Sequence, residues 1–278
     1  MAARLLYCAA AVSALAVLAI LAFLVYFSLP LFQGDQLAAL FSWHWRPLQN
    51  EFGILPMIAA SLALAVSSML VAYPLALGVC CFAHGLGPDW AARPLLVAVR
   101  LMSSVPTVVY GLVAAFSLVP LIRGASSGSG LCWLAALLTL AVLALPTIVL
   151  LLDNQFQRLE SEIRLTAAAL GLTRVQEMLQ LTLPLSSRGL VMAAILGFGR
   201  ALGDTLVPLM LAGNAPQPPL SLLDPMRTLT AHIALVVATD SQSAAYNSLF
   251  ACGLILFLLT VLVNLGLRRI RTGATAHG

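Results

Sequence analysis

Long runs of apolar residues, each interrupted by few charges, restrict the fold of this chain more than any other feature of its sequence. A helix needs about 20 apolar residues to cross the hydrocarbon core of a bilayer. Only 9% of the 278 residues are charged, whereas a soluble domain carries about 25%. We therefore expect an all-α membrane protein in which residues 1–278 form a single domain. The predicted membrane-spanning helices are six, at about 5–29, 54–82, 95–122, 131–152, 190–212 and 246–267.

The arginines predict the orientation of these helices, because cytoplasmic loops carry the excess of Lys and Arg. The run from Leu5 to Leu29 is longer than the 7–15 or so residues of a signal-peptide core, so we interpret it as an uncleaved anchor. If the N-terminus is cytoplasmic, ten arginines lie inside, three lie outside, and Arg200 lies within the fifth span. We therefore predict that both termini are cytoplasmic. The three external arginines are Arg46, Arg123 and Arg227.

The absence of lysine excludes several functions for this chain. All 14 basic residues are arginine, whereas a phosphate-binding P-loop needs a lysine in GxxxxGK[ST]. Any ATP that drives this protein must therefore be hydrolysed by another subunit. The five cysteines form no CxxC or Cys/His cluster with metal-ligand spacing, and we expect no metal or cofactor bound by this chain. An intramembrane enzyme is an alternative, but no HExxH motif supports it.

Residues 153–189 form the long polar loop that the predicted topology places in the cytoplasm. Apolar residues recur there at helical spacing, Gly171 separates two helix-favouring stretches, and Pro184 is expected to stop the second. We predict two short amphipathic helices joined at Gly171, where glycine permits a positive φ. A surface helix that merely connects two spans is the alternative.

The spacing in this loop resembles the cytoplasmic signature of ABC importer permeases, which reads Glu-Ala-Ala, three residues, Gly, nine residues, Ile-x-Leu-Pro. Leu165 stands where the signature has glutamate, and Thr166 stands where it has the first alanine. The resemblance implies that 165–184 is a coupling helix that docks in a groove of an ATPase subunit, with one polar contact of the docking lost at Leu165. The positions that match are Ala167, Gly171, Leu181, Leu183 and Pro184.

The predicted fifth span contains two charges, Arg200 and Asp204. A charge at the bilayer centre costs about 2.5–3.5 kcal/mol on insertion scales, and such residues usually face a polar cavity or a partner. A spacing of four places both on one helical face, and Gly199 and Gly203 would let another helix pack closely. One interpretation is a self-neutralising pair that fixes helix packing. The other is a translocation site in which Arg200 binds an oxyanion, Asp204 accepts a hydrogen bond from protonated phosphate, and Thr205 adds a hydroxyl.

A cluster of proline, glycine and hydroxyl residues lies within the predicted third span. Proline and glycine are tolerated in membrane helices and often bend them. The cluster is therefore either a simple kink or a hinge that lines the pore, and the sequence leaves both open. Its members are Ser104, Pro106, Thr107, Tyr110 and Gly111.

Several segments resemble the phosphate-specific importer (Pst) permeases. LGFGRALGDT at 196–205 matches the family pattern Leu-Gly-hydrophobic-Gly-Arg-Ala-hydrophobic-Gly-Glu-Thr, with Asp204 replacing the usual glutamate. SVPTVVYGL at 104–112 resembles the third span of the family, and GNAP at 213–216 and RTLTAHIAL at 227–235 resemble the loop after the fifth span. The likeness runs from about residue 53 to residue 270 and is closer to the C-type permease than to the A-type.

The resemblance implies a type I ABC importer permease of a bacterial inner membrane that moves inorganic phosphate into the cytoplasm by alternating access. Its partners would be membrane lipid, a second related permease, two ATPase subunits that bind ATP and Mg²⁺, and an external phosphate-binding protein. No nucleic acid is expected. The alternatives are a permease for sulfate, molybdate or tungstate, a degenerate permease that acts as a scaffold or sensor, and a passive anion channel.

Overall fold

The computed structural model describes residues 2–29, 40–46, 49, 51–126, 128–239 and 244–272. Part of the predicted first external loop lies outside these ranges. Most of the described residues are helical, and the strands form one short hairpin. The elements are α1 (Ala2–Ser28), β1 (Trp45–Arg46), β2 (Glu51–Phe52), α3 (Leu55–Cys81), the π-helix η3 (Phe82–Leu86), α4 (Asp89–Ser103), α5 (Thr107–Ala125), α6 (Trp133–Ala169), α7 (Arg174–Gln176), the π-helix η4 (Glu177–Thr182), α8 (Leu183–Leu185), α9 (Ser187–Gly203), α10 (Leu206–Leu211), α11 (Leu229–Thr239) and α12 (Ala244–Thr272).

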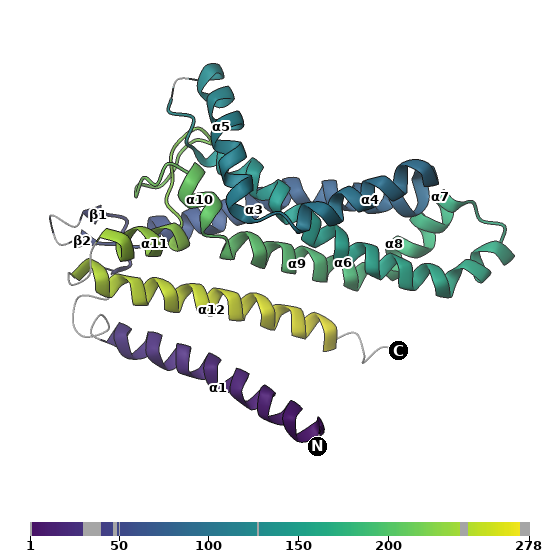
Figure 1. Ribbon diagram of the computed structural model, residues 1–278, viewed down its shortest axis with the longest axis horizontal. Coiled ribbons are helices and arrows are strands. Elements are labelled where there is room, and N and C mark those ends of the chain that lie inside the picture. Colours follow the sequence, from purple (N-terminus) through teal and green to yellow (C-terminus); the bar gives the residue numbers. More distant parts are fainter. Residues whose placement is uncertain are drawn as a thin grey trace.

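Helices α3, α6, α9 and α12 run along the long axis of the molecule, and α5 stands away from it (Figure 1). The core lies where α3, α6 and α9 pack together, and small buried residues such as Ala72, Ala144 and Ala193 let their backbones approach. Helix α1 lies beside α12 at the edge of the molecule, where Phe27 stacks on Phe250. The other faces of α1 are exposed, as expected for a helix that lies in lipid.

The prediction of apolar membrane helices is confirmed. Among the described residues, four helices are long and apolar enough to cross a membrane, and their bounds are Arg4–Ser28, Leu55–Leu86, Thr107–Ala125 and Trp133–Glu160. A fifth results if Arg174–Leu185 and Ser187–Gly203, which meet at a bend of 70°, count as one span. The described part of α12 adds a shorter apolar helix, Ser248–Val263. The full count of six remains a prediction.

The predicted third span is not one helix. Helix α4 ends at Ser103, and α5 begins at Thr107 after Pro106, whose backbone is extended at a ψ of 142°. Proline disfavours helical backbone in the residue before it, so the helix stops here. The first part of the predicted span belongs instead to an amphipathic helix, α4, which begins at Asp89.

The predicted fourth and fifth spans also have different bounds. Helix α6 continues through 37 residues to Ala169, because no glycine or proline occurs between Thr147 and Leu170 to stop it. Helix α9 ends at Gly203, Asp204 is extended at φ −71° and ψ 131°, and the short helix α10 follows. The fifth span is therefore two helices joined at Asp204.

Close packing of α9 within the chain occurs at Gly197. A Cβ at Gly197 would lie 2.7 Å from Cγ1 of Ile148 and 3.0 Å from Cε of Met69, whereas a Cβ at Gly199 or Gly203 would meet nothing within 4 Å. Gly199 and Gly203, which the sequence suggested for close packing, therefore leave open space in this chain.

We expect Gly197→Ala to destabilise the protein by about 1–3 kcal/mol, because the added methyl overpacks the contact with α6 and α3. The matched control is Gly199→Ala on the same helix, which should be neutral or stabilising by up to about 1 kcal/mol. Thermal unfolding of the purified protein in detergent measures both. Equal melting temperatures for the two variants would show that Gly197 is not a packing constraint.

Candidate translocation site and coupling segment

Arg200 lies near the end of α9 and lines a cavity of about 620 Å³ between α6, α9 and α12. Most of the lining is apolar, with hydroxyl groups from Thr147 on α6 and Thr260 on α12, and Arg200 is its charged residue. The Arg200 side chain is exposed in the single chain. A guanidinium presents several N–H donors in a planar fork, which bind an oxyanion through charge-assisted hydrogen bonds. The cavity therefore has the chemistry of an anion site.

Asp204 and Thr205 lie at the break between α9 and α10 and are not among the residues that line this cavity. Oδ1 of Asp204 accepts a hydrogen bond of 2.9 Å from the backbone N–H of Val207, at the start of α10. No ion pair joins Arg200 to Asp204 in the part of the chain that the structure describes. The expectation that both lie on one helical face is wrong, because α9 ends at Gly203. Asp204 instead caps the next helix.

The predicted hinge cluster surrounds the break between α4 and α5. The hydroxyl of Tyr110 donates a hydrogen bond of 2.7 Å to the carbonyl of Met102, so it spans the break. Gly111 packs against Met210 of α10, where a Cβ would lie 2.6 Å from the sulfur. The bend is therefore present, and its role as a hinge or pore lining stays a prediction. The remaining members are Ser104, at the end of α4, Pro106, in the break, and Thr107, at the start of α5.

The coupling segment, residues 165–184, turns sharply at Gly171, whose φ is +67°. The N–H of Gly171 donates to the carbonyl of Ala168, and the N–H of Leu172 donates to that of Ala167. This pair of bonds is a Schellman motif, which ends a helix at a glycine of positive φ. The turn at Gly171 is therefore as predicted. The first of the two expected short helices is instead the end of α6.

Thr173 begins the second helical stretch of the coupling segment with a capping box to Gln176. Pro184 does not stop this stretch, since it lies in the first turn of α8 and the backbone leaves the helix at Ser186. Ala167 is buried, and Leu181 and Leu183 are partly buried. The segment also exposes large apolar side chains, which form a surface suited to a protein partner. These are Leu165 (83% exposed), Leu170 (65%) and Leu179 (54%).

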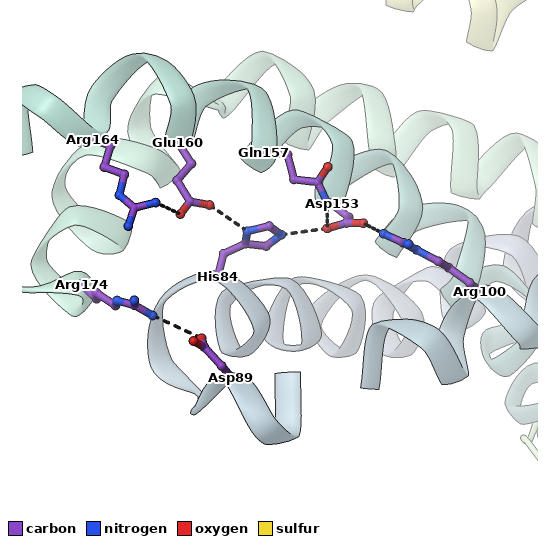
Figure 2. A network of polar contacts seen from close by, with 8 residues as sticks. All are labelled: His84, Asp89, Arg100, Asp153, Gln157, Glu160, Arg164 and Arg174. Carbon is purple, nitrogen blue, oxygen red and sulfur yellow. Dashed lines mark hydrogen bonds and ion pairs between the residues drawn. The ribbon is translucent and has the colours of Figure 1, made fainter. Parts of the chain in front are cut away.

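A polar network next to the coupling segment was missed by sequence reasoning (Figure 2). Asp153 of α6 lies 2.8 Å from Nε2 of His84 and 3.0 Å from Nη2 of Arg100. The available signal was an acid directly after an apolar run. Its partners are 69 and 53 positions away in the sequence, so local spacing could not identify them.

The letters GASSG at 124–128 fit the GxSxG spacing of serine hydrolases. That motif requires a turn between a strand and a helix, whereas here the segment begins in the last turn of α5. Ser126 donates its hydroxyl to the carbonyl of Ile122. The described geometry therefore gives no nucleophile elbow.

Comparisons with known proteins agree with this architecture. Residues 82–273 match the family model described as the inner membrane component of binding-protein-dependent transport systems. The probable ABC transporter permease protein YqgH of Bacillus subtilis is 34% identical over 233 residues, which are 82% of this chain and 75% of that protein. The phosphate transport system permease protein PstC of Pasteurella multocida is 30% identical over 247 residues, or 80% of this chain and 76% of that protein.

A solved structure shares the fold. The inward-facing MetNI methionine ABC transporter matches 82% of this chain and 99% of its own chain, with a TM-score of 0.63 and 20% identity. The region that matches the family model contains the coupling segment, Arg200 and the polar network. The chain therefore belongs to the family of inner membrane components of binding-protein-dependent transport systems.

Proposed function

We propose that this chain is a permease subunit of an ATP-driven ABC importer that moves inorganic phosphate into the cytoplasm. The observation that carries the proposal is Arg200, the charged residue on the wall of a cavity that is otherwise apolar apart from two hydroxyl groups. Relatives about 30% identical to this chain, from Pasteurella multocida and Xylella fastidiosa, are phosphate transport system permease proteins.

Phosphate suits this cavity for chemical reasons. The planar fork of a guanidinium matches two oxygens of a tetrahedral anion, and threonine hydroxyls can donate to the others or accept from protonated phosphate. Thr147 and Thr260 line the same cavity as Arg200. The hydroxyl of Thr260 donates to the carbonyl of Leu256, so it is left to accept from the substrate. In the working cycle, the cavity opens first to the outside and then to the cytoplasm. The chain needs no covalent chemistry on the substrate, and ATP and Mg²⁺ belong to the ATPase.

The complete importer would contain this chain, a second related permease, two ATPase subunits and an external phosphate-binding protein. Support for the ATPase contact comes from the exposed Leu165, Leu170 and Leu179 on the coupling segment. Helix α1 begins, and α12 ends, toward the end of the molecule that carries α7 and α8 (Figure 1), which favours cytoplasmic termini and six spans.

Asp204→Asn separates two roles of this residue, because asparagine caps a helix about as well as aspartate but carries no charge. We expect assembly, thermal stability and phosphate uptake all to be retained, because Asp204 does not line the cavity of Arg200 and its carboxylate accepts from the N–H of Val207. A fall in uptake of about tenfold would instead show that the charge of Asp204 contacts the substrate, since a hydrogen bond to a charged group is worth about 1.5–3 kcal/mol. Asp204→Glu should keep uptake or improve discrimination against sulfate. Uptake and melting temperature are measured on the same preparations. Loss of assembly in Asp204→Glu would assign Asp204 to packing instead.

Competition between anions tests the substrate. Uptake of labelled phosphate is measured with a large excess of sulfate, molybdate or tungstate, while the binding protein is kept constant. We expect none of these anions to compete. Inhibition by one of them would retain the importer and change its substrate.

A further inference from the structure

Asp153 anchors a network of polar contacts next to the coupling segment (Figure 2). Its side chain is 3% exposed and lies on α6. Oδ1 lies 2.8 Å from Nε2 of His84 and accepts a 2.9 Å hydrogen bond from Gln157. Oδ2 accepts a 3.0 Å hydrogen bond from Arg100. His84 comes from η3 and Arg100 from α4, so one carboxylate holds three elements together.

The same elements contact the coupling segment. Nδ1 of His84 lies 3.5 Å from Oε2 of Glu160, further along α6. Gly85 of η3 packs so closely against Met178 of η4 that a Cβ there would lie 2.7 Å from that of Met178. The space left between η3, α6 and η4 is about 10 Å³, which is about enough for one water molecule. Displacement of η4 would therefore press directly on η3.

A second contact ties the second helical stretch of the coupling segment to α4. Nη1 of Arg174, at the start of α7, lies 3.4 Å from Oδ1 of Asp89, at the start of α4. Both side chains are exposed, so this ion pair contributes little energy by itself. It nevertheless brings the start of α7 close to the start of α4 (Figure 2).

A buried carboxylate resists separation from its donors, because the charge would be left without partners in a site that excludes water. Asp153 therefore holds η3, α4 and the surrounding part of α6 together. Helix α4 leads through the break at Pro106 into α5. If η4 moves, we therefore expect η3 and α4 to move with it, and α5 to follow α4.

We propose that Asp153, together with His84 and Arg100, is a positioning centre that transmits movement of the coupling segment to α4 and α5 and so keeps ATP hydrolysis coupled to transport. The inference rests on the proposed function, since it assigns a role within the same cycle. The three residues do not contact the substrate cavity.

The test compares Asp153→Asn and Arg100→Gln in proteoliposomes that contain the complete importer. Asparagine keeps the volume of aspartate but has one acceptor oxygen instead of two, so it cannot accept from Arg100 on one side and from Gln157 on the other. We expect phosphate moved per ATP hydrolysed to fall by roughly 2- to 30-fold, while ATP hydrolysis continues. The control is Arg123→Gln, which removes an arginine that donates to the carbonyl of Ser129 outside the network. Its transport ratio should equal that of the unmodified protein.

An unchanged ratio in both network variants would overturn the proposal. If Asp153→Asn does not assemble, Arg100→Gln decides, because the Arg100 side chain is 55% exposed and its loss is less disruptive to folding. A purely structural role would lower the melting temperature without changing the ratio, and that result would also contradict the proposal.

A second readout is independent of the substrate. Spin labels at Val175 and Leu121, both exposed, are introduced after the native cysteines are replaced, and their distance is measured with and without ATP. We expect ATP to change this distance in the parent protein and not in Asp153→Asn. If the parent takes up no phosphate but shows this difference, the proposed substrate is wrong and the positioning role stands. The same ATP-induced change in both proteins would refute the positioning role.

Discussion

Replacing Arg200 with alanine is expected to reduce ATP-dependent phosphate uptake by at least about 30-fold while the complex still assembles. Arg200 is the charged residue of the cavity between α6, α9 and α12. A hydrogen bond to a charged group is worth about 1.5–3 kcal/mol, and a loss of about 2 kcal/mol corresponds to about 30-fold. The side chain is exposed in this chain, so its removal should leave the packing of α9 intact. Initial uptake rates measure the effect.

The matched control for Arg200 is lysine, which keeps the positive charge but loses the planar fork. We expect Arg200→Lys to retain more uptake than the alanine variant and less than the parent. Arg123→Ala, in the last turn of α5, should have no effect on uptake. Normal transport by a folded complex that carries Arg200→Ala would refute the translocation site.

Gly171→Pro is expected to disconnect the ATPase from this subunit. Gly171 has a φ of +67°, whereas proline requires about −65°. Proline also removes the N–H that donates to the carbonyl of Ala168. The distortion costs about 3 kcal/mol or more, so affinity for the ATPase should fall by about 100-fold. Copurification of the ATPase and its stimulation by the permease measure this loss.

Gly171→Asn is the matched control, because asparagine enters the left-handed region more readily than other residues with a side chain. A Cβ at Gly171 would meet nothing within 4 Å, so the change introduces no clash inside the chain. We expect ATPase binding to be largely retained. Normal binding and stimulation with Gly171→Pro would mean that the coupling assignment is wrong.

Local signals in the sequence predicted the features that depend on local backbone. The turn at Gly171 could be predicted because a glycine follows a helix-favouring stretch. The apolar runs predicted α1, α3 and α12 with bounds close to those observed. The bend near Pro106 was also visible, because proline restricts the residue before it. The division of the predicted third span into α4 and α5 was not visible, because an apolar run does not show where one helix ends and the next begins.

Features that depend on tertiary contacts could not be predicted from local patterns in the sequence. The spacing of Arg200 and Asp204 predicted one helical face, but α9 ends at Gly203 and the carboxylate of Asp204 caps α10. Short-range periodicity cannot show that the backbone is extended at a single residue. The partners of Asp153 come from elements that meet it only after folding.

Uptake of labelled phosphate into vesicles that contain this chain, its partner permease, the ATPase and the binding protein tests the central claim most directly. The account predicts phosphate entry that requires ATP and that excess sulfate or molybdate does not inhibit. Phosphate entry without ATP would indicate a passive channel. A verified complex that moves no oxyanion in the presence of ATP would contradict the account and favour a scaffold or sensor.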